Sequence, residues 1–131
     1  MELSRDGIYN SYGQRIAWLS HFLKARFKCK ERPRVQMLSQ FFGPNSVVFD
    51  IGAHFGYLSK EFCRLYDASC QVHAFEPVEY TRSILRHVVG GLDNAVIVEN
   101  ALSDREVSLN ISIPVKKSGK LGIGLSHFGT E

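Results

Sequence analysis

A glycine-containing turn between a predicted strand and a predicted helix is the part of the sequence best suited to bind a ligand. The short apolar run 46–50 is typical of a buried strand, and it continues into Asp50-Ile-Gly52-Ala53-His-Phe-Gly56. Glycines at such a turn let the backbone approach a ligand closely, and the following helix presents free N–H groups and the positive end of its dipole. The residue types and their order therefore predict a nucleotide-binding turn.

The end of the next predicted strand carries a second acidic residue. Glu76 lies 20 residues after Gly56, and an acidic side chain at this place in nucleotide-binding folds accepts hydrogen bonds from ribose hydroxyls. The same carboxylate is also placed to cap the helix that follows. The two roles are compatible, and we favour ribose binding.

Two side chains of the turn bear on which nucleotide it holds. The dinucleotide pattern GxGxxG would have its second glycine where this chain has His54. A carboxylate at Asp50 would repel a pyrophosphate, whereas it suits a cationic, amino-bearing ligand or serves to order the loop. A nicotinamide-dependent dehydrogenase is therefore disfavoured. We interpret His54 as shaping the loop or the edge of the cofactor site.

Residues 46–99 follow the order strand, helix, strand, helix, strand. The strands are predicted at 46–50, 71–75 and 95–98, and the helices at 57–66 and from Pro77 to Gly90. Apolar strands joined by helices imply a parallel sheet with helices packed on it, so the predicted class is α/β. In the second of these helices, Arg82 and Arg86 are expected on a solvated face.

Two helices are predicted before the sheet. We therefore assign residues 1–45 to an N-terminal helical extension and 46–131 to a Rossmann-like cofactor-binding domain. The helix at 12–29 has an apolar face made of Ile16, Leu19, Leu23 and Phe27. The helix that begins at Pro33 has an apolar stripe made of Val35, Leu38, Phe41 and Phe42. Stripes of this kind normally face a core.

After the sheet the pattern changes to strict alternation. The apolar members are Val107, Leu109, Ile111 and Ile113, with Ser108, Asn110 and Ser112 between them. Such alternation is typical of a half-buried antiparallel strand. Residues 116–120 are predicted to turn, and 121–128 to return as the partner strand.

Composition limits the class of protein. With 131 residues and 44% hydrophobic composition, the chain suffices for one soluble domain. No apolar run approaches the roughly 20 residues of a membrane helix, so no membrane span is expected. The N-terminus has no signal segment, and Cys29, Cys63 and Cys70 are interpreted as free thiols packed in or near a core. A cytoplasmic location without a metal site or disulfide framework is therefore expected.

Basic residues gather near the N-terminus. Between Lys24 and Arg34, six of eleven residues are Lys or Arg. We favour a solvated helix end and loop, and the alternative is an anionic partner such as nucleic acid, a membrane surface or a charged substrate. Nucleic acid is disfavoured because only one aromatic residue, Phe27, is interleaved with the charges.

Three blocks of the sequence, taken together, resemble the FkbM family of class I S-adenosyl-L-methionine-dependent methyltransferases. They are VVFDIGAHFGYLSKEFCRLY, VHAFEPVEYTRSILRHVV and VIVENALSDREVSLNISIP, and the match covers about two-thirds of the chain, from Val47 to Phe128. The resemblance implies that the turn cradles the methionine part of S-adenosyl-L-methionine and that Glu76 binds its ribose. It also implies that Asn100 and Ala101 contact the adenine ring. The residues assigned to the turn are Asp50, Gly52, Ala53 and Gly56.

The activity implied by the resemblance is methyl transfer to oxygen. The acceptor would be a small molecule, a glycan or a lipid-linked hydroxyl, and the chain would be the enzyme or its cofactor-binding portion. In-line attack on the sulfonium methyl needs alignment and at most one general base, which the sequence does not identify. The alternative is a non-catalytic cofactor-binding or interaction module that retains the fold.

The resemblance also implies more sheet than this chain offers. Class I methyltransferase sheets usually have seven strands, with the first strand in the middle. Here three parallel strands and an antiparallel element are predicted, so the sheet is expected to be incomplete at its C-terminal side. The open edge of the first strand would need covering by residues 107–128, by the N-terminal helices, by a second copy or by a partner chain.

Overall fold

The computed structural model describes residues 11–106, 108, 110–116, 121–123 and 127–129. The chain divides into two compact units, which are Trp18–Leu102 and the pair of segments Met1–Ala17 and Ser103–Glu131. Each unit is described by itself below. Of the predicted C-terminal elements, Val107, Leu109, most of the turn at 116–120 and residues 124–126 lie outside the described residues.

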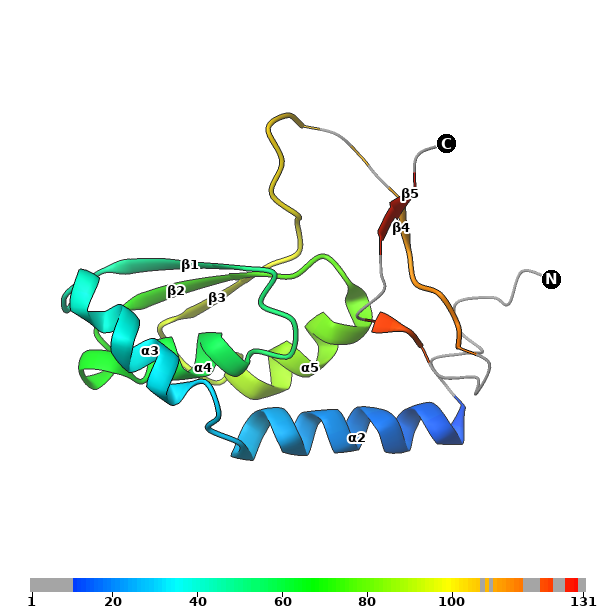
Figure 1. Ribbon diagram of the computed structural model, residues 1–131, viewed down its shortest axis with the longest axis horizontal. Coiled ribbons are helices and arrows are strands. Elements are labelled where there is room, and N and C mark those ends of the chain that lie inside the picture. Colours follow the sequence, from blue (N-terminus) through cyan, green and yellow to red (C-terminus); the bar gives the residue numbers. More distant parts are fainter. Residues whose placement is uncertain (1–10, 107, 109, 117–120, 124–126, 130–131) are drawn as a thin grey trace. The chain divides into compact units, whose positions relative to one another are not determined.

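The larger unit contains a three-stranded parallel sheet. Its strands are β1 (Val47–Ile51), β2 (Gln71–Phe75) and β3 (Ala95–Val98), in the spatial order β1-β2-β3 (Figure 1). The register places Ile51 beside Phe75, and Phe75 beside Val98, so the three strands end at the same level. The predicted α/β class with a parallel sheet is confirmed, and all three strand predictions are correct to within a residue at each end.

Helices connect the strands and cover one face of the sheet. They are α4 (Tyr57–Cys63), with a 3₁₀ turn at Leu65–Ala68, and α5 (Glu79–Val89) (Figure 1). The apolar face predicted for α5 is buried, as shown by Ile84, Leu85, Val88 and Val89. On the covered face of the sheet, Val72 packs with Phe62 and Cys63 of α4. On the opposite face Phe49 is 61% exposed.

Helix α3 (Arg32–Leu38) packs beside α4 and continues into a 3₁₀ turn at Ser39–Phe41. Val35 is buried, and the ring of Phe42 lies 6.1 Å from that of Phe62. The prediction that Phe41 belongs to the same stripe is wrong, because this side chain is 82% exposed. The 3₁₀ turn tightens the backbone after Leu38 and takes Phe41 away from the helical spacing on which the stripe was based.

The N-terminal helix α2 (Tyr12–Phe27) forms as predicted but packs with a different face. The four residues predicted as its apolar face, Ile16, Leu19, Leu23 and Phe27, are 43–71% exposed. Instead the indole N–H of Trp18 donates to Ser83 Oγ at 2.8 Å, and His21 stacks on Phe55 at 4.9 Å. The helix is apolar on two sides, and the side whose rings also form hydrogen bonds is the one that docks.

Lys60 of α4 caps the end of α2. Its ammonium group is buried and donates to the carbonyls of Ala25, Arg26 and Lys28 at 2.5, 3.2 and 2.6 Å. The last carbonyls of a helix lack intrahelical partners and carry partial negative charge, so a cation stabilises them. Burial lowers the pKa of Lys60, and electrostatic interactions with Cys29 and Glu61 act in the opposite direction by raising it.

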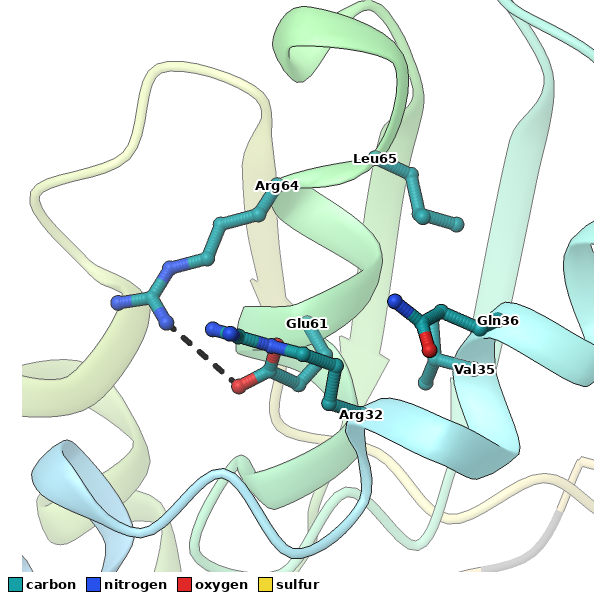
Figure 2. Close-up of a pocket in the computed structure, with 6 residues that line it drawn as sticks. All are labelled: Arg32, Val35, Gln36, Glu61, Arg64 and Leu65. Carbon is teal, nitrogen blue, oxygen red and sulfur yellow. Dashed lines mark hydrogen bonds and ion pairs between the residues drawn. The ribbon is translucent and has the colours of Figure 1, made fainter.

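The neighbouring residue, Glu61, joins α4 to α3. Its carboxylate is buried and lies 3.1 Å from Arg32 Nε and 3.5 Å from Arg64 Nη1. Figure 2 shows both guanidinium groups reaching this carboxylate at the rim of a cavity of about 300 Å³. The hydrogen bond and the charge of Glu61 raise the pKa of Arg32 above its ordinary value. Two adjacent charged side chains of α4 therefore hold α2 and α3.

The smaller unit contains a two-stranded antiparallel sheet. Strands β4 (Asn110–Ser112) and β5 (His127–Gly129) pair with Ile111 opposite Phe128, and an isolated bridge joins Val115 to Leu121. The prediction of an antiparallel strand with a returning partner is confirmed for these residues. Among the described helices, none is long and apolar enough to cross a membrane.

We predict that Lys60→Met lowers the free energy of unfolding by about 2–4 kcal/mol, because three carbonyls lose their donor in a buried place. Lys24→Met is the matched control, since Lys24 is an exposed lysine of α2, and it should cost less than about 0.5 kcal/mol. Urea denaturation measures both. Equal effects of the two substitutions would show that the cap contributes nothing.

Candidate functional site

The predicted turn lies at the level where the three strands end. Gly52 and Gly56 have φ angles of +76° and +81°, in the left-handed region that favours glycine. A Cβ atom on Gly56 would also lie 2.7 Å from Leu85 Cδ1, whereas one on Gly52 would meet nothing within 4 Å. Gly56 is therefore required by conformation and by the close approach to α5. Gly52 is required by conformation alone and leaves open space above the turn.

Backbone hydrogen bonds hold the turn against β2. The N–H groups of Gly52 and Ala53 both donate to the carbonyl of Phe75, at 3.0 and 2.9 Å, and the N–H of Gly56 donates to the carbonyl of Ala53. The N–H of His54 donates to Glu76 Oε2 at 2.8 Å. Because these four donors have partners within the protein, the turn is a poor cradle for a pyrophosphate. This agrees with the interpretation drawn from His54 and Asp50.

Glu76 connects the turn to the start of α5. Besides His54, it accepts a hydrogen bond from the N–H of Val78, the N-cap residue of α5, at 3.0 Å. The capping role expected of this carboxylate is thus present, and the side chain is buried. Each carboxylate oxygen can accept a further hydrogen bond. Ribose binding by Glu76 stays a prediction.

Asp50 faces the helices rather than the open side of the sheet. Its Oδ2 accepts a hydrogen bond of 2.5 Å from Ser59 Oγ in the first turns of α4, and the carboxyl is 7% exposed. Burial raises the pKa of Asp50, the hydrogen bond from Ser59 opposes this, and the charge of Glu76 adds to it. Of the two roles considered for Asp50, the geometry favours ordering the loop and the helix behind it.

His54 is held in the left-handed region with φ of +53°, and its ring lies 3.9 Å from that of Phe55. Burial lowers the pKa of His54 and thereby favours its neutral form, while the charge of Glu76 opposes this. These contacts suit the loop-shaping role assigned to it.

The end of β3 is tied to α5 by ion pairs. Glu99 lies 2.5 Å from Arg86 Nη2 and 3.6 Å from Arg82 Nη2, and both arginines also pair with Glu79. The prediction that Arg82 lies on a solvated face is wrong. This side chain is 8% exposed and donates to the carbonyls of Glu76 and Pro77, because its guanidinium caps the bend between β2 and α5.

The structure brings most of the predicted site residues together. Hydrogen bonds hold Gly52, Ala53, Gly56 and Glu76 together at the ends of β1 and β2. Asp50 lies in β1 just before them and bonds Ser59 of α4. The other two, Asn100 and Ala101, follow β3 and are exposed.

Four polar residues that fix the helices around this group were missed from the sequence. Ser59, Lys60 and Glu61 lie between the apolar residues Leu58 and Phe62, and the sequence analysis assigned them no role. Because α4 is covered by the sheet on one side and by α2 and α3 on the other, all three are buried. The one feature that could have revealed their burial is that they belong to a helix placed between the sheet and the N-terminal helices. For Arg82, the fourth residue, no sequence feature indicated burial.

The cysteines are free, as expected. Cys63 and Cys70 are buried, and burial raises the pKa of Cys63 to about 11. Cys29 is exposed, so the expectation that it packs in or near a core is wrong. It lies in the loop between α2 and α3, where Arg32 donates to its sulfur.

No protein-family model matches the chain, and the search of curated proteins also gives no match. The resemblance to the FkbM methyltransferases therefore stays a prediction.

We predict that Gly56→Ala destabilises the protein by about 3–5 kcal/mol and Gly52→Ala by about 1–2 kcal/mol. Both alanines must adopt positive φ, but only that at position 56 collides with Leu85. The difference between the two free energies of unfolding isolates the helix contact. Similar losses for the two variants would contradict the close approach of α4 and α5.

A pH-dependent prediction follows from Asp50. Since its pKa is raised in the folded state, folding is favoured while Asp50 is protonated, and stability falls as pH rises through its folded pKa. Ser59→Ala removes the hydrogen bond that stabilises the ionised carboxylate. It should cost about 1.5–3 kcal/mol at neutral pH and less at mildly acidic pH.

Ser103→Ala is the matched control, because Ser103 donates to Asp104 in an exposed place. Its effect should be small at both pH values. A loss in Ser59→Ala that does not change with pH would show that Asp50 is not the partner that matters.

Proposed function

We propose that the sheet and turn bind S-adenosyl-L-methionine, as the cofactor-binding portion of a Rossmann-like methyltransferase of FkbM type. The observation that carries the proposal is the turn itself. It joins a parallel strand to a helix, has left-handed glycines at both ends and is held by the acidic residue that ends the neighbouring strand. In open parallel sheets, ligands bind outside the carboxyl ends of the strands.

The negative charge near the turn and the small number of free backbone N–H donors favour S-adenosyl-L-methionine over a dinucleotide. Four N–H groups of the turn have acceptors within the protein, which leaves few donors for a diphosphate. Two carboxylates, Asp50 and Glu76, lie close enough for the charge of one to raise the pKa of the other. A cationic sulfonium and an α-amino group would be attracted to this negative potential, and a diphosphate would be repelled.

The residues present fit the parts of the cofactor as follows. The open space above Gly52 would admit the methionine part, the remaining lone pairs of Glu76 would accept from the ribose hydroxyls, and Asn100 with the backbone of Ala101 would border the adenine ring. The bound cofactor supplies the methyl group, and the chain positions it. An oxygen nucleophile on a small molecule, a glycan or a lipid-linked acceptor is the class that we propose.

A second candidate is a non-catalytic module that keeps the fold. The observation that favours it is that both carboxylates of the turn have structural partners, Asp50 with Ser59 and Glu76 with two backbone N–H groups. Transfer of a labelled methyl group to an oxygen acceptor by the purified chain would exclude this candidate.

We predict that the chain binds S-adenosyl-L-methionine and S-adenosylhomocysteine in calorimetric titrations. The wild type should bind the 2′-deoxy analogue of S-adenosylhomocysteine about 10- to 150-fold more weakly, because a hydrogen bond to a charged acceptor contributes about 1.5–3 kcal/mol. In Glu76→Gln this preference should be lost.

The comparison of two ligands in one variant separates recognition from folding. If Glu76 serves only as a cap, the substitution weakens both ligands equally and their ratio stays as in the wild type. Absence of heat with millimolar ligand, or unchanged discrimination in Glu76→Gln, would contradict the proposed function.

A further inference from the structure

The outer side of α2 carries a continuous apolar stripe. Leu19, Leu23 and Phe27 are 51%, 43% and 71% exposed, and Ile16, which precedes them at the same helical spacing, is 53% exposed. Residues three and four apart lie on one face of a helix, so these side chains form one surface. We call these four residues the outer stripe.

The outer stripe is not the docking face of the helix. Within the larger unit, the opposite side of α2 already packs on the neighbouring elements through Trp18, His21 and Ala25, and Lys60 fixes its end. A rotation that buried the outer stripe would break these contacts and expose the indole ring. The stripe is therefore directed outward by the contacts of the other face.

Positive charge flanks the outer stripe. Residues 11–30 contain five Lys or Arg and no Asp or Glu. At 100° per residue, Arg26 lies next to the stripe on one side and Lys24 on the other. Within the described residues, the ion pairs of the basic segment involve Lys30, Arg32 and Arg34, which leaves Lys24, Arg26 and Lys28 for an external anion.

We propose that the outer stripe of α2 and its flanking basic residues bind the surface of an anionic lipid bilayer. A helix with an exposed apolar face between Lys and Arg side chains lies in the interface, with its apolar face among the acyl chains and its cations at the headgroups. The long stems of Lys24 and Arg26 let their charges reach the headgroups while the stripe is inserted.

Charge favours a bilayer over a second copy of the chain. Two outer stripes packed together would bring Lys24, Arg26 and Lys28 of one copy near the same residues of the other, with no acidic side chain in 11–30 to pair with them. An anionic surface instead neutralises every one of these charges. The proposal goes beyond the proposed function and does not depend on cofactor binding.

Flotation with lipid vesicles tests the proposal on the full chain. It should bind vesicles of equal parts phosphatidylcholine and phosphatidylglycerol, bind phosphatidylcholine alone much more weakly, and dissociate as salt is raised. Leu23→Ser with Phe27→Ser, and separately Lys24→Glu with Lys28→Glu, should each weaken binding about tenfold or more.

Two variants away from α2 are the matched controls. Phe41→Ser removes an aromatic side chain that is 82% exposed, and Arg105→Glu reverses a charge that is 79% exposed. Both should bind vesicles as the wild type does. Urea midpoints close to that of the wild type show that every variant is folded.

Several outcomes would overturn the proposal. The first is equal binding to neutral and anionic vesicles, and the second is wild-type binding by the outer-stripe variants. The third is that the chain binds no vesicles and instead forms a dimer that the outer-stripe variants abolish. Capture of an acidic protein partner through the stripe, again without vesicle binding, would also overturn it.

Discussion

The ammonium group of Lys60 joins α4, the helix that follows the turn, to the end of the N-terminal helix α2. It is almost fully buried, and its hydrogen bonds go to carbonyls at and just beyond the end of α2. A buried cation is stable only where such acceptors replace its water. Lys60 therefore has no comparable place in a structure without α2, and α2 has no other donor of this kind at its end among the described residues. The end of α2 is thus held by one side chain of α4, beside the contacts that Trp18 and His21 make along the helix.

Helix α4 is short, yet consecutive polar side chains connect it to three different elements. Ser59 bonds Asp50 at the end of β1, Lys60 bonds the end of α2, and Glu61 pairs with Arg32 of α3. Successive residues of a helix point about 100° apart, so neighbours in sequence reach different layers. Because Gly56 begins α4 and packs against Leu85, the turn is fixed by the same helix. A site built on such a supported turn is formed before any ligand arrives.

The sequence predicted what depends on local pattern. The three strands, the turn and the buried face of α5 follow from apolar runs and glycine positions, and the structure has them where they were expected. The prediction of the apolar face of α2 did not identify the side that packs. A helix that is apolar on two sides gives no periodic signal for which side docks. That choice depends on Trp18 meeting Ser83, 65 residues away. Arg82 was misassigned for a different reason, because its acceptors are the backbone carbonyls of Glu76 and Pro77 in the bend just before α5, which side-chain periodicity does not show.

The face of the sheet opposite the helices is apolar and uncovered in the part of the chain that is described. Val47, Phe49 and Ile51 of β1 are all more than half exposed, and the outer edge of β1 has no partner strand among the described residues. Parallel sheets are almost always covered on both faces, and open edges invite pairing. Both features belong to the strand that leads into the turn. A segment that pairs with β1 and covers Phe49 would therefore border the candidate site.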